Sequence, residues 1–233
     1  MRQAAPHQRG AAGCKWNGGE KGKAVRGGVS GGSFKKGDIK MVYLTGDTHA
    51  VFDRIGDFSE KGRRHREDIR IILGDTGINY FLGSKAVAIK EHLSELPVTF
   101  FCIHGNHEQR PFAIKTHREK LWSGAVAYVE DAYPSILFAK DGEIYDFDGK
   151  KAIAIGGAYS VDKFYRQKKG YAWYDNEQPS ASIKKYVEEQ LDRAEWKIDY
   201  VLSYTLPLKY EPVDKYLPFI DQVHGVGPPQ DHI

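Results

Sequence analysis

The stretch MVYLTGDTH, residues 41–49, runs from four apolar residues into a glycine, an aspartate and a histidine. The apolar run is too short for a helix and is rich in residues that favour strands. We therefore interpret it as a buried strand whose end carries Asp47 and His49. A glycine–aspartate pair after a strand is, taken alone, typical of an ordinary turn. The alternative is a metal site.

Three further apolar runs have the same form, namely IRIILGDTG (69–77), VTFFCIHGNHE (98–108) and DYVLSYT (199–205). Each is predicted to be a buried strand because it is short and rich in β-branched or aromatic residues. The segments 84–96 and 179–197 have apolar spacing that favours helices, and Ser180 can cap the second one. In the first of these helices the expected buried positions are Val87, Ile89, Leu93 and Leu96. Strand, helix and strand in this order predict a right-handed crossover and parallel pairing.

The segment 135–160 has a different pattern. Its short strand-like runs are separated by Asp141-Gly142 and Asp148-Gly149, dipeptides that are typical of tight hairpins. We therefore expect an antiparallel meander after the parallel units. Because 41–222 contains no internal repeat and no linker, it is predicted to form one α/β domain with a mixed sheet or two packed sheets.

Side chains that can bind a metal follow three of the predicted strands. They are Asp47 and His49, then Asp75, then Asn106 and His107. Ligands of α/β sheets bind beyond the carboxyl ends of the strands, so these side chains should meet at one edge if the strands are neighbours. Carboxylate, amide and imidazole donors together suit manganese, iron or zinc better than calcium. Turns alone rarely give three such strand ends spaced by roughly 25 to 30 residues, the length of a βαβ unit.

Residues 1–40 differ in composition from the rest of the chain. They hold nine Lys/Arg, two acidic residues and ten of the 25 glycines, a net charge of +7, whereas the rest carries −4. We predict a disordered basic tail, and likewise no structure for residues 223–233. Two alternatives stay open for the first segment: an arm that binds nucleic acid or phosphate, and a natural start of the protein at Met41. A P-loop is not supported, because no G-x-x-x-x-G-K-[ST] run is present there.

The cysteine content and the hydropathy of the chain indicate its cellular compartment. The two cysteines, Cys14 and Cys102, make no disulfide framework, and Cys102 is expected to be a buried free thiol. That favours a reducing, cytoplasmic environment. No stretch reaches the roughly 18 apolar residues of a membrane helix, and the first residues lack the apolar core of a secretory signal. We therefore expect a cytoplasmic protein with no membrane partner.

The motifs GDTH (46–49), GDTG (74–77) and GNHE (105–108) resemble the signature of the calcineurin-like metallophosphoesterases. The stretch GGAYSVDKFYR…GYAWYDNEQPS resembles bacterial and phage members of that family. The resemblance covers about residues 41–222. It implies a four-layer sandwich of two mixed β-sheets flanked by helices, and a two-metal site that hydrolyses phosphate esters with manganese, iron or zinc. The substrate is not specified by any segment.

The resemblance also implies a role for each matching residue. The metal ligands would be Asp47, His49, Asp75 and Asn106. Asp75 would bridge both cations, and Asn106 would hold the second through its side-chain oxygen. His107 would be the catalytic group that stabilises charge on the phosphate or protonates the leaving oxygen. Glu108 would contact the ligands rather than a metal.

Two motifs of the family are missing. Tyr204 stands in VLSYT where the family has a histidine, and no G-H-x-H follows before Ile233. The resemblance implies a chain that lacks the C-terminal part of the domain and three histidine ligands. We therefore predict a weak to moderate first metal site, a badly weakened second site and impaired activity. His224 could fold back as a substitute ligand, and His232 lies in the same tail.

Other residues with suggestive chemistry have plain structural interpretations. His104 is expected to be a structural histidine, and His65 to lie in a solvated charged run that could also steer anions. Lys163 or Arg166 could hold phosphate oxygens. A dense aromatic group is interpreted as packing, with base stacking as the alternative. Its members are Tyr159, Tyr165, Tyr171, Trp173 and Tyr174.

The leading hypothesis from the sequence is therefore a metal-dependent phosphoesterase. The rival is a catalytically silent protein that keeps this fold and binds nucleic acid or a nucleotide. A weaker third possibility is an ordinary α/β fold without a metal. The oligomeric state is not predicted.

Overall fold

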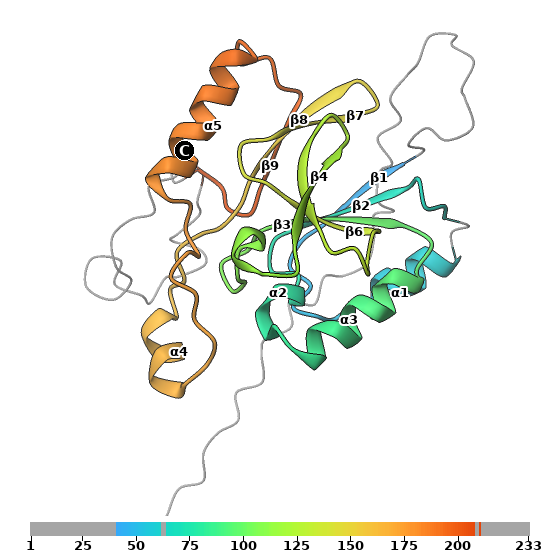
Figure 1. Ribbon diagram of the computed structural model, residues 1–233, viewed down its shortest axis with the longest axis vertical. Helices are drawn as coiled ribbons and strands as arrows, with labels where there is room; N and C mark the ends of the chain where they lie inside the picture. Colours follow the sequence, from blue (N-terminus) through green and yellow to red (C-terminus); the bar gives the residue numbers. More distant parts are fainter. Residues whose placement is uncertain (1–40, 62–63, 208–209, 211–233) are drawn as a thin grey trace, which may run out of the picture. The chain divides into compact units, whose positions relative to one another are not determined.

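The computed structural model describes residues 41–61, 64–207 and 210 (Figure 1). The predictions for residues 1–40 and 223–233, including those for His224 and His232, lie outside this part of the chain. The described residues form a six-stranded sheet in the order β1-β2-β3-β6-β5-β4 and a three-stranded sheet in the order β7-β8-β9. Both sheets combine parallel and antiparallel pairs.

The strands of the first sheet are β1 (Val42–Thr45), β2 (Ile69–Leu73), β3 (Thr99–Ile103), β4 (Arg118–Trp122), β5 (Ala125–Val129) and β6 (Ile136–Ala139). Those of the second are β7 (Ile144–Phe147), β8 (Lys150–Ile155) and β9 (Tyr200–Ser203). The helices are α1 (Asp53–Lys61), α2 (Ile78–Phe81), α3 (Ser84–Glu95), α4 (Lys163–Lys169) and α5 (Ala181–Arg193), with the 3-10 turn η1 (Pro111–Ala113).

The parallel core of the first sheet is as predicted. β1, β2 and β3 are parallel neighbours, and β6 pairs with β3 in the same direction. Because these four strands run the same way, their carboxyl ends lie along one edge of the sheet. The loops that follow β1, β2 and β3 at this edge carry the predicted metal-binding motifs.

Alternation along the strands divides the apolar residues between two layers. Ile71 and Phe101 face the second sheet, where Phe101 packs against the rings of Tyr145 and Phe147. The neighbouring residues Ile72, Phe100 and Cys102 belong to another cluster on the opposite face of the sheet. Burial on both faces explains why β2 and β3 are continuous apolar runs, and it places Cys102 as the expected buried free thiol.

Helices cover the outer faces of both sheets. Ile55 of α1 and Leu93 of α3 pack on the first sheet, and Figure 1 shows α1, α2 and α3 together on that side. Val187 and Leu191 of α5 pack against Ile153 of β8 on the second sheet. The order helices, sheet, sheet, helix is the predicted four-layer sandwich.

The structure corrects two details of the prediction. Asp148-Gly149 does turn a hairpin between β7 and β8, with positive φ at both residues. Asp141-Gly142 does not, because β6 belongs to the first sheet and β7 to the second, so the expected meander is wrong. In α3, Val87 is 41% exposed and the buried positions include Lys90.

Several elements were not predicted, namely α1, α2, α4, η1 and the hairpin of β4 and β5. By contrast, α5 lies within the predicted segment 179–197, and the expected cap is present. The N–H of Ile183 donates to Oγ of Ser180 at 3.3 Å. This bond satisfies one of the free donors at the helix start.

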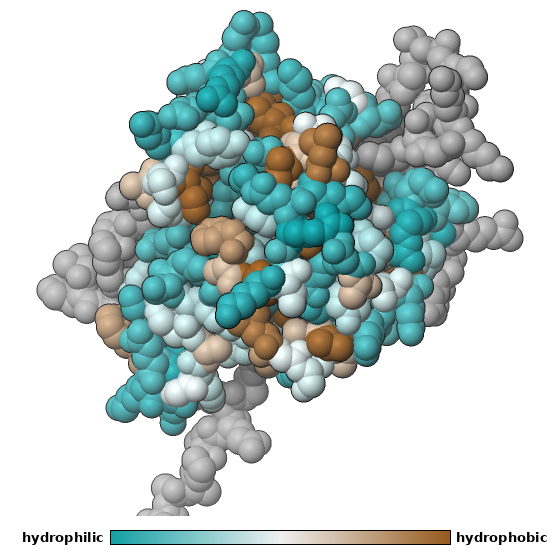
Figure 2. Space-filling model, viewed as in Figure 1, coloured by the Kyte–Doolittle hydropathy of each residue, from teal (hydrophilic) through white to brown (hydrophobic). Residues whose placement is uncertain are grey.

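On the face of the molecule drawn in Figure 2, the described residues form no large apolar patch. Hydrophilic residues dominate this face, and the apolar ones form small separate groups. Scattered apolar residues of this kind are normal for a protein surface. Among the described residues, no helix is both long enough and apolar enough to span a bilayer.

Candidate metal centre

The loops after β1 and β2 are joined by backbone hydrogen bonds. The N–H groups of Thr48 and His49 donate to the carbonyl of Asp75 at 3.2 and 2.8 Å, and that of Ala50 donates to the carbonyl of Thr76 at 3.0 Å. His49 and Asp75 have left-handed backbones, with φ of 44° and 43°. Such conformations cost about 1–3 kcal/mol for non-glycine residues and occur preferentially at functional sites. Both predicted ligands are therefore fixed by the same pair of strained loops.

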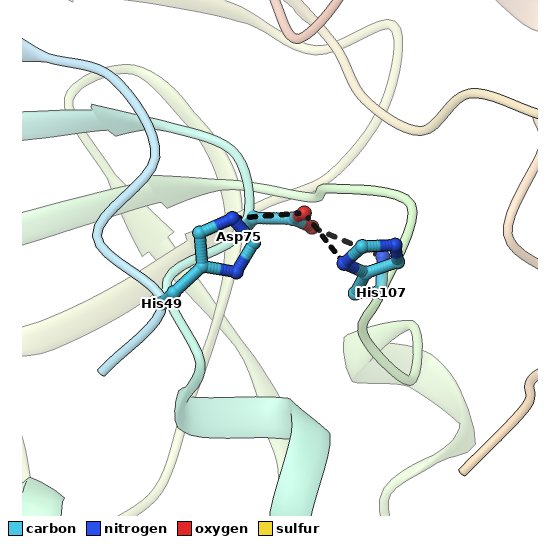
Figure 3. A group of neighbouring side chains, drawn as sticks. All are labelled: His49, Asp75 and His107. Atoms are coloured by element: carbon cyan, nitrogen blue, oxygen red, sulfur yellow. Dashed lines mark hydrogen bonds and ion pairs between the residues drawn. The ribbon is translucent and has the colours of Figure 1, made fainter. Parts of the chain in front are cut away.

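The side chain of Asp75 lies between two imidazoles (Figure 3). Its Oδ2 is 3.9 Å from Nε2 of His49 and 3.2 Å from Nδ1 of His107. Nε2 of His49 is also 3.7 Å from Oδ2 of Asp47. One donor atom each from His49, Asp75 and His107 lie within 4.8 Å of one another. Histidines and carboxylates from three strand ends thus converge on one small volume.

Asp75 is the buried centre of this group. It is 1% exposed, and its loop fits tightly against Gly105, where an added Cβ would lie 2.0 Å from Oδ1 of Asp75. Oδ1 accepts a hydrogen bond from the backbone N–H of His107 at 3.0 Å. Burial works to raise the pKa of this carboxyl, but the hydrogen bonds from His107 outweigh it, so the pKa lies below its usual range. Asp75 is therefore held as a carboxylate.

Asp47 and His49 form the open side of the group, with side chains 49% and 55% exposed. The hydrogen bond with Asp47 is the main cause that raises the pKa of His49, and burial opposes it. A metal binds the neutral imidazole, so protons compete with a cation for this side chain.

His107 has carboxylates on both sides of its ring. Nδ1 faces Asp75, and Nε2 is 3.6 Å from Oδ1 of Asp162, the residue that precedes α4. The side chain of His107 is 28% exposed, so a ligand at the edge of the sheet can reach it. The sequence motifs alone gave no indication that Asp162 would approach this histidine.

Tyr204 reaches the same group from the end of β9. Its hydroxyl lies 2.8 Å from Oδ1 of Asn106 and 3.2 Å from Oδ2 of Asp75, donating to these oxygens. Burial, followed by the charge of Asp75, raises the pKa of this hydroxyl far above its usual range, so Tyr204 is a neutral phenol. The position predicted to have lost a histidine ligand is thus in contact with two of the predicted ligands.

A series of hydrogen bonds between buried side chains orients Asn106. Its Nδ2 donates to Oγ of Ser160 at 2.8 Å, and Oγ of Ser160 donates to Oε2 of Glu177 at 2.6 Å. Since the amide N–H₂ is directed to Ser160, the amide oxygen is directed to Tyr204. Ser160 and Glu177 lie in the stretches 156–166 and 170–180, and nothing in their spacing identified them as partners of Asn106.

Glu108 connects the loops after β2 and β3. It is 2% exposed, and its Oε1 accepts hydrogen bonds from the Thr76 hydroxyl and from the N–H of Gly77, the latter at 2.8 Å. Burial raises the pKa of Glu108 to about 7. Among the described residues, Glu108 forms no hydrogen bond with a predicted metal ligand. Its supporting role stays a prediction, compatible with this placement.

The other residues singled out by sequence fall outside the centre. Burial holds the pKa of His104 well below its usual range, and its Nε2 has no hydrogen-bond partner among the described residues. His65 is exposed, as predicted. Arg166 is 4% exposed and donates to Oγ of Ser160 and to the carbonyl of Ala172, so it is not free to hold phosphate.

The aromatic group around α4 is divided between packing and exposure. The Tyr174 hydroxyl donates to the carbonyl of Tyr80 at 2.6 Å. Lys163 lies 4.7 Å from the ring centroid of Trp173. Tyr165 and Tyr171 are 56% and 54% exposed. Packing therefore explains only part of this group, and the alternative of base stacking stays untested.

The donor set fits one divalent cation better than two. Asp47, His49 and the side of Asp75 that faces them offer two carboxylates and an imidazole, with 3.7 and 3.9 Å between donor atoms. Donors that bind one ion at about 2.0–2.2 Å must be slightly closer together than this, so small side-chain movements suffice. The second predicted pair, Asp75 and Asn106, faces the Tyr204 hydroxyl instead. These residues do not fit a second cation as they stand.

The fold and the three strand-end motifs define a class of protein that comparison also identifies. The sequence model of the family described as calcineurin-like phosphoesterase matches residues 41–214. The chain therefore belongs to the calcineurin-like phosphoesterase family. Neither the curated proteins nor the solved structures gave a significant match. The bacterial or phage type and the shortened C-terminal part stay predictions.

Proposed function

We propose that this chain hydrolyses phosphate esters with the help of a divalent cation held by Asp47, His49 and Asp75. The convergence of these three side chains at the joined loops after β1 and β2 carries the proposal. Family membership gives the reaction class. A divalent cation bound there would polarise the phosphate and lower the pKa of a water molecule. Manganese, iron and zinc all suit the donor set.

The chain's own side chains would orient the ester and handle its proton. His107 lies beside Asp75 and is partly open to solvent, so it is placed to donate a hydrogen bond to a phosphate oxygen and a proton to the departing one. Asp75 and Asp162 lie next to opposite ring nitrogens and limit the rotation of the imidazole, while the backbone bond to Asp75 holds the His107 main chain in place. The Asn106 amide and the Tyr204 hydroxyl form the rigid opposite wall of the site.

Hydrolysis of p-nitrophenyl phosphate and of its bis ester, with and without manganese, tests the proposal. We expect manganese-dependent release of nitrophenol that a chelator stops and that Asp75→Ala abolishes. His107→Gln should retain manganese while turnover falls by roughly 10²- to 10⁴-fold, the usual contribution of a proton donor. Turnover that is unchanged in Asp75→Ala, or absent from the wild type at saturating manganese, would contradict the proposal.

The second candidate function is that of a catalytically silent binding protein for a nucleotide or nucleic acid. The observation that favours it is Tyr204, a neutral phenol at a position where the family resemblance implies a ligand. Exposed Tyr165 and Tyr171 offer faces on which bases could stack. Binding of a fluorescent oligonucleotide or nucleotide without any ester hydrolysis, and its loss in Tyr165→Ala, would favour this function over the first.

A further inference from the structure

The hydroxyl of Tyr204 lies between two oxygens that the family resemblance assigns to a second cation. These are Oδ1 of Asn106, at 2.8 Å, and Oδ2 of Asp75, at 3.2 Å. A divalent cation would lie about 2.0–2.2 Å from oxygens of this kind. The hydroxyl and a cation at this position would therefore compete for the same lone pairs.

The ring of Tyr204 is fixed by its contact with Gly74. A Cβ added at Gly74 would lie 1.9 Å from Cδ2 of Tyr204, so the ring rests directly on the glycine backbone. Gly74 also has a φ of 91°, a conformation that side-chain-bearing residues rarely adopt. The absence of a side chain at residue 74 thus creates the space that the tyrosine ring fills. Movement of the hydroxyl out of the centre would require this packing to be lost.

The partner oxygens are fixed as well. Asn106 directs its amide oxygen to Tyr204 because Nδ2 is bonded to Ser160, which in turn donates to Glu177. On Asp75, Oδ1 accepts from the His107 backbone. The series of donors from Tyr204 to Asn106, Ser160 and Glu177 is complete, with each donor facing an acceptor. This side of the centre is fully hydrogen-bonded without an ion.

The contact between Asp75 and His49 is looser than the contact with Tyr204. Its Oδ2 is 3.9 Å from Nε2 of His49, too far for a hydrogen bond, and Oδ2 of Asp47 is 3.7 Å from the same nitrogen. Asp47 and Asp75 thus both approach the same exposed imidazole. The contacts of Oδ2 are therefore unequal: the Tyr204 hydroxyl donates to it at 3.2 Å, whereas Nε2 of His49 lies beyond hydrogen-bond distance.

We propose that the Tyr204 hydroxyl takes the place of the second cation of the family, joining Asp75 to Asn106 and leaving this chain with a centre for one cation. The inference rests on the proposed function for its first cation. It differs from simple loss of a ligand, because the tyrosine fills the position and preserves the geometry of Asp75 and Asn106. Restoring an imidazole at residue 204 should then reopen the second position.

Counting manganese ions in the full chain tests this inference. Wild type, Tyr204→His and a control, Tyr200→His, are stripped with a chelator and titrated with manganese, and bound ions are counted by equilibrium dialysis and by electron paramagnetic resonance. Tyr200 lies on the same strand and is 46% exposed, so the control adds an imidazole away from the centre. We expect one ion for the wild type and the control, and two for Tyr204→His.

The spectrum gives a readout that is independent of the variants. A single manganese ion gives an isolated six-line signal, whereas two ions about 3.5–4 Å apart are magnetically coupled. A coupled pair in the wild type, or no added ion in a folded Tyr204→His chain, would overturn the inference. Circular dichroism checks folding, and if that variant does not fold, the wild-type spectrum decides. A wild type with no manganese would contradict the proposed function, and the ion gained by Tyr204→His would still decide the inference.

Discussion

Two aspartates that follow parallel strands of the same sheet have opposite surroundings. Asp75 stands two residues after β2, and Asp141 stands two residues after β6. Asp141 has protein partners on both oxygens: Oδ2 pairs with the Arg110 guanidinium, and Oδ1 accepts from the N–H of Gly156 at 2.6 Å. Asp75 also has a partner on each oxygen, the His107 N–H on Oδ1 and the Tyr204 hydroxyl on Oδ2, but it faces the imidazoles of His49 and His107 rather than an arginine.

This difference separates a structural carboxylate from a candidate ligand. Arg110, 1% exposed, also donates to the carbonyls of Asn176 and Gly156 at 2.7 and 3.2 Å, so the pair belongs to a satisfied network. Burial nevertheless raises the pKa of Asp141, whereas hydrogen bonds from His107 lower that of Asp75 against burial. A buried carboxylate that faces metal-binding imidazoles rather than an arginine is thus the better candidate for an ion.

The largest expected effect comes from breaking the structural pair. Arg110→Met leaves Asp141 buried without its cation, and we expect the free energy of unfolding to fall by about 3–5 kcal/mol. Urea denaturation measures this change. The control is Lys150→Met, which removes the exposed ion pair with Asp199 and should change stability little. Equal effects of the two substitutions would show that burial of the Arg110–Asp141 pair has no consequence.

Substitution of the candidate ligand Asp75 should lower metal affinity and leave stability nearly unchanged. Asp75→Asn keeps an acceptor for the His107 N–H and removes the charge, so stability should change by less than about 1 kcal/mol. Manganese affinity should fall by roughly 100-fold or more, equivalent to about 2.7 kcal/mol of binding free energy. Isothermal titration calorimetry measures the affinity. The matched control is Asp141→Asn, and the comparison fails if that variant loses manganese to the same extent.

A buried histidine away from the metal centre, His117, should make the free energy of unfolding depend on pH. Burial lowers the pKa of His117 to about 4, against the opposing charge of Glu130, whose Oε1 lies 3.4 Å from Nδ1. Neither ring nitrogen forms a hydrogen bond with the described residues. An unfolded histidine has a pKa of about 6.5, so between pH 6.5 and 4 the unfolded chain binds a proton that the folded chain excludes.

Stability should therefore fall as the pH falls through that window, by about 2 kcal/mol between pH 7.5 and 5. Urea denaturation at several pH values measures this loss. His117→Leu removes the titrating group, so the difference between wild type and variant isolates its contribution. Parallel pH profiles for the two chains would show that His117 titrates normally in the folded protein.

The smallest effects distinguish the two Asp-Gly dipeptides. Gly142 and Gly149 have similar positive φ values, 84° and 78°. An added Cβ at Gly142 would lie 2.7 Å from Cδ1 of Tyr186, whereas at Gly149 nothing lies within 4 Å. Gly149→Ala should cost about 1 kcal/mol through backbone strain alone. Gly142→Ala should cost more, and thermal denaturation of the two variants should rank them in that order.

The parts of the fold that sequence predicted are those that depend on near neighbours. β1, β2 and β3 are continuous apolar runs ended by glycine, and the short connections between them impose parallel pairing. The start of α5 was predicted from Ser180, a local cap. Because the same local patterns end each strand with polar residues, the positions of Asp47, Asp75 and Asn106 at one edge of the sheet also followed from sequence.

The sequence patterns did not predict the elements whose stability comes from packing. The sequence of α1 contains Gly56 and several charges, and the helix forms where Phe52 and Ile55 are buried against the first sheet. Lys90 was not expected to be buried in α3, but Glu130 lies 2.7 Å from its Nζ. Intrinsic preferences of a short segment carry no information about such distant partners.

By itself, the sequence determined the family, the parallel strands and the candidate donor residues at their ends, because these depend on residue type and local spacing. Only the tertiary structure decided which carboxylate is paired with an arginine and which faces the imidazoles. Asp141 finds Arg110 31 residues away, and Tyr204 finds Asp75 across 129 residues. The first contact joins loops that follow β3 and β6 of the first sheet, and the second joins the end of β9 in the second sheet to the loop after β2. A hydrogen bond depends on distances of a few tenths of an ångström, which sequence separation does not encode.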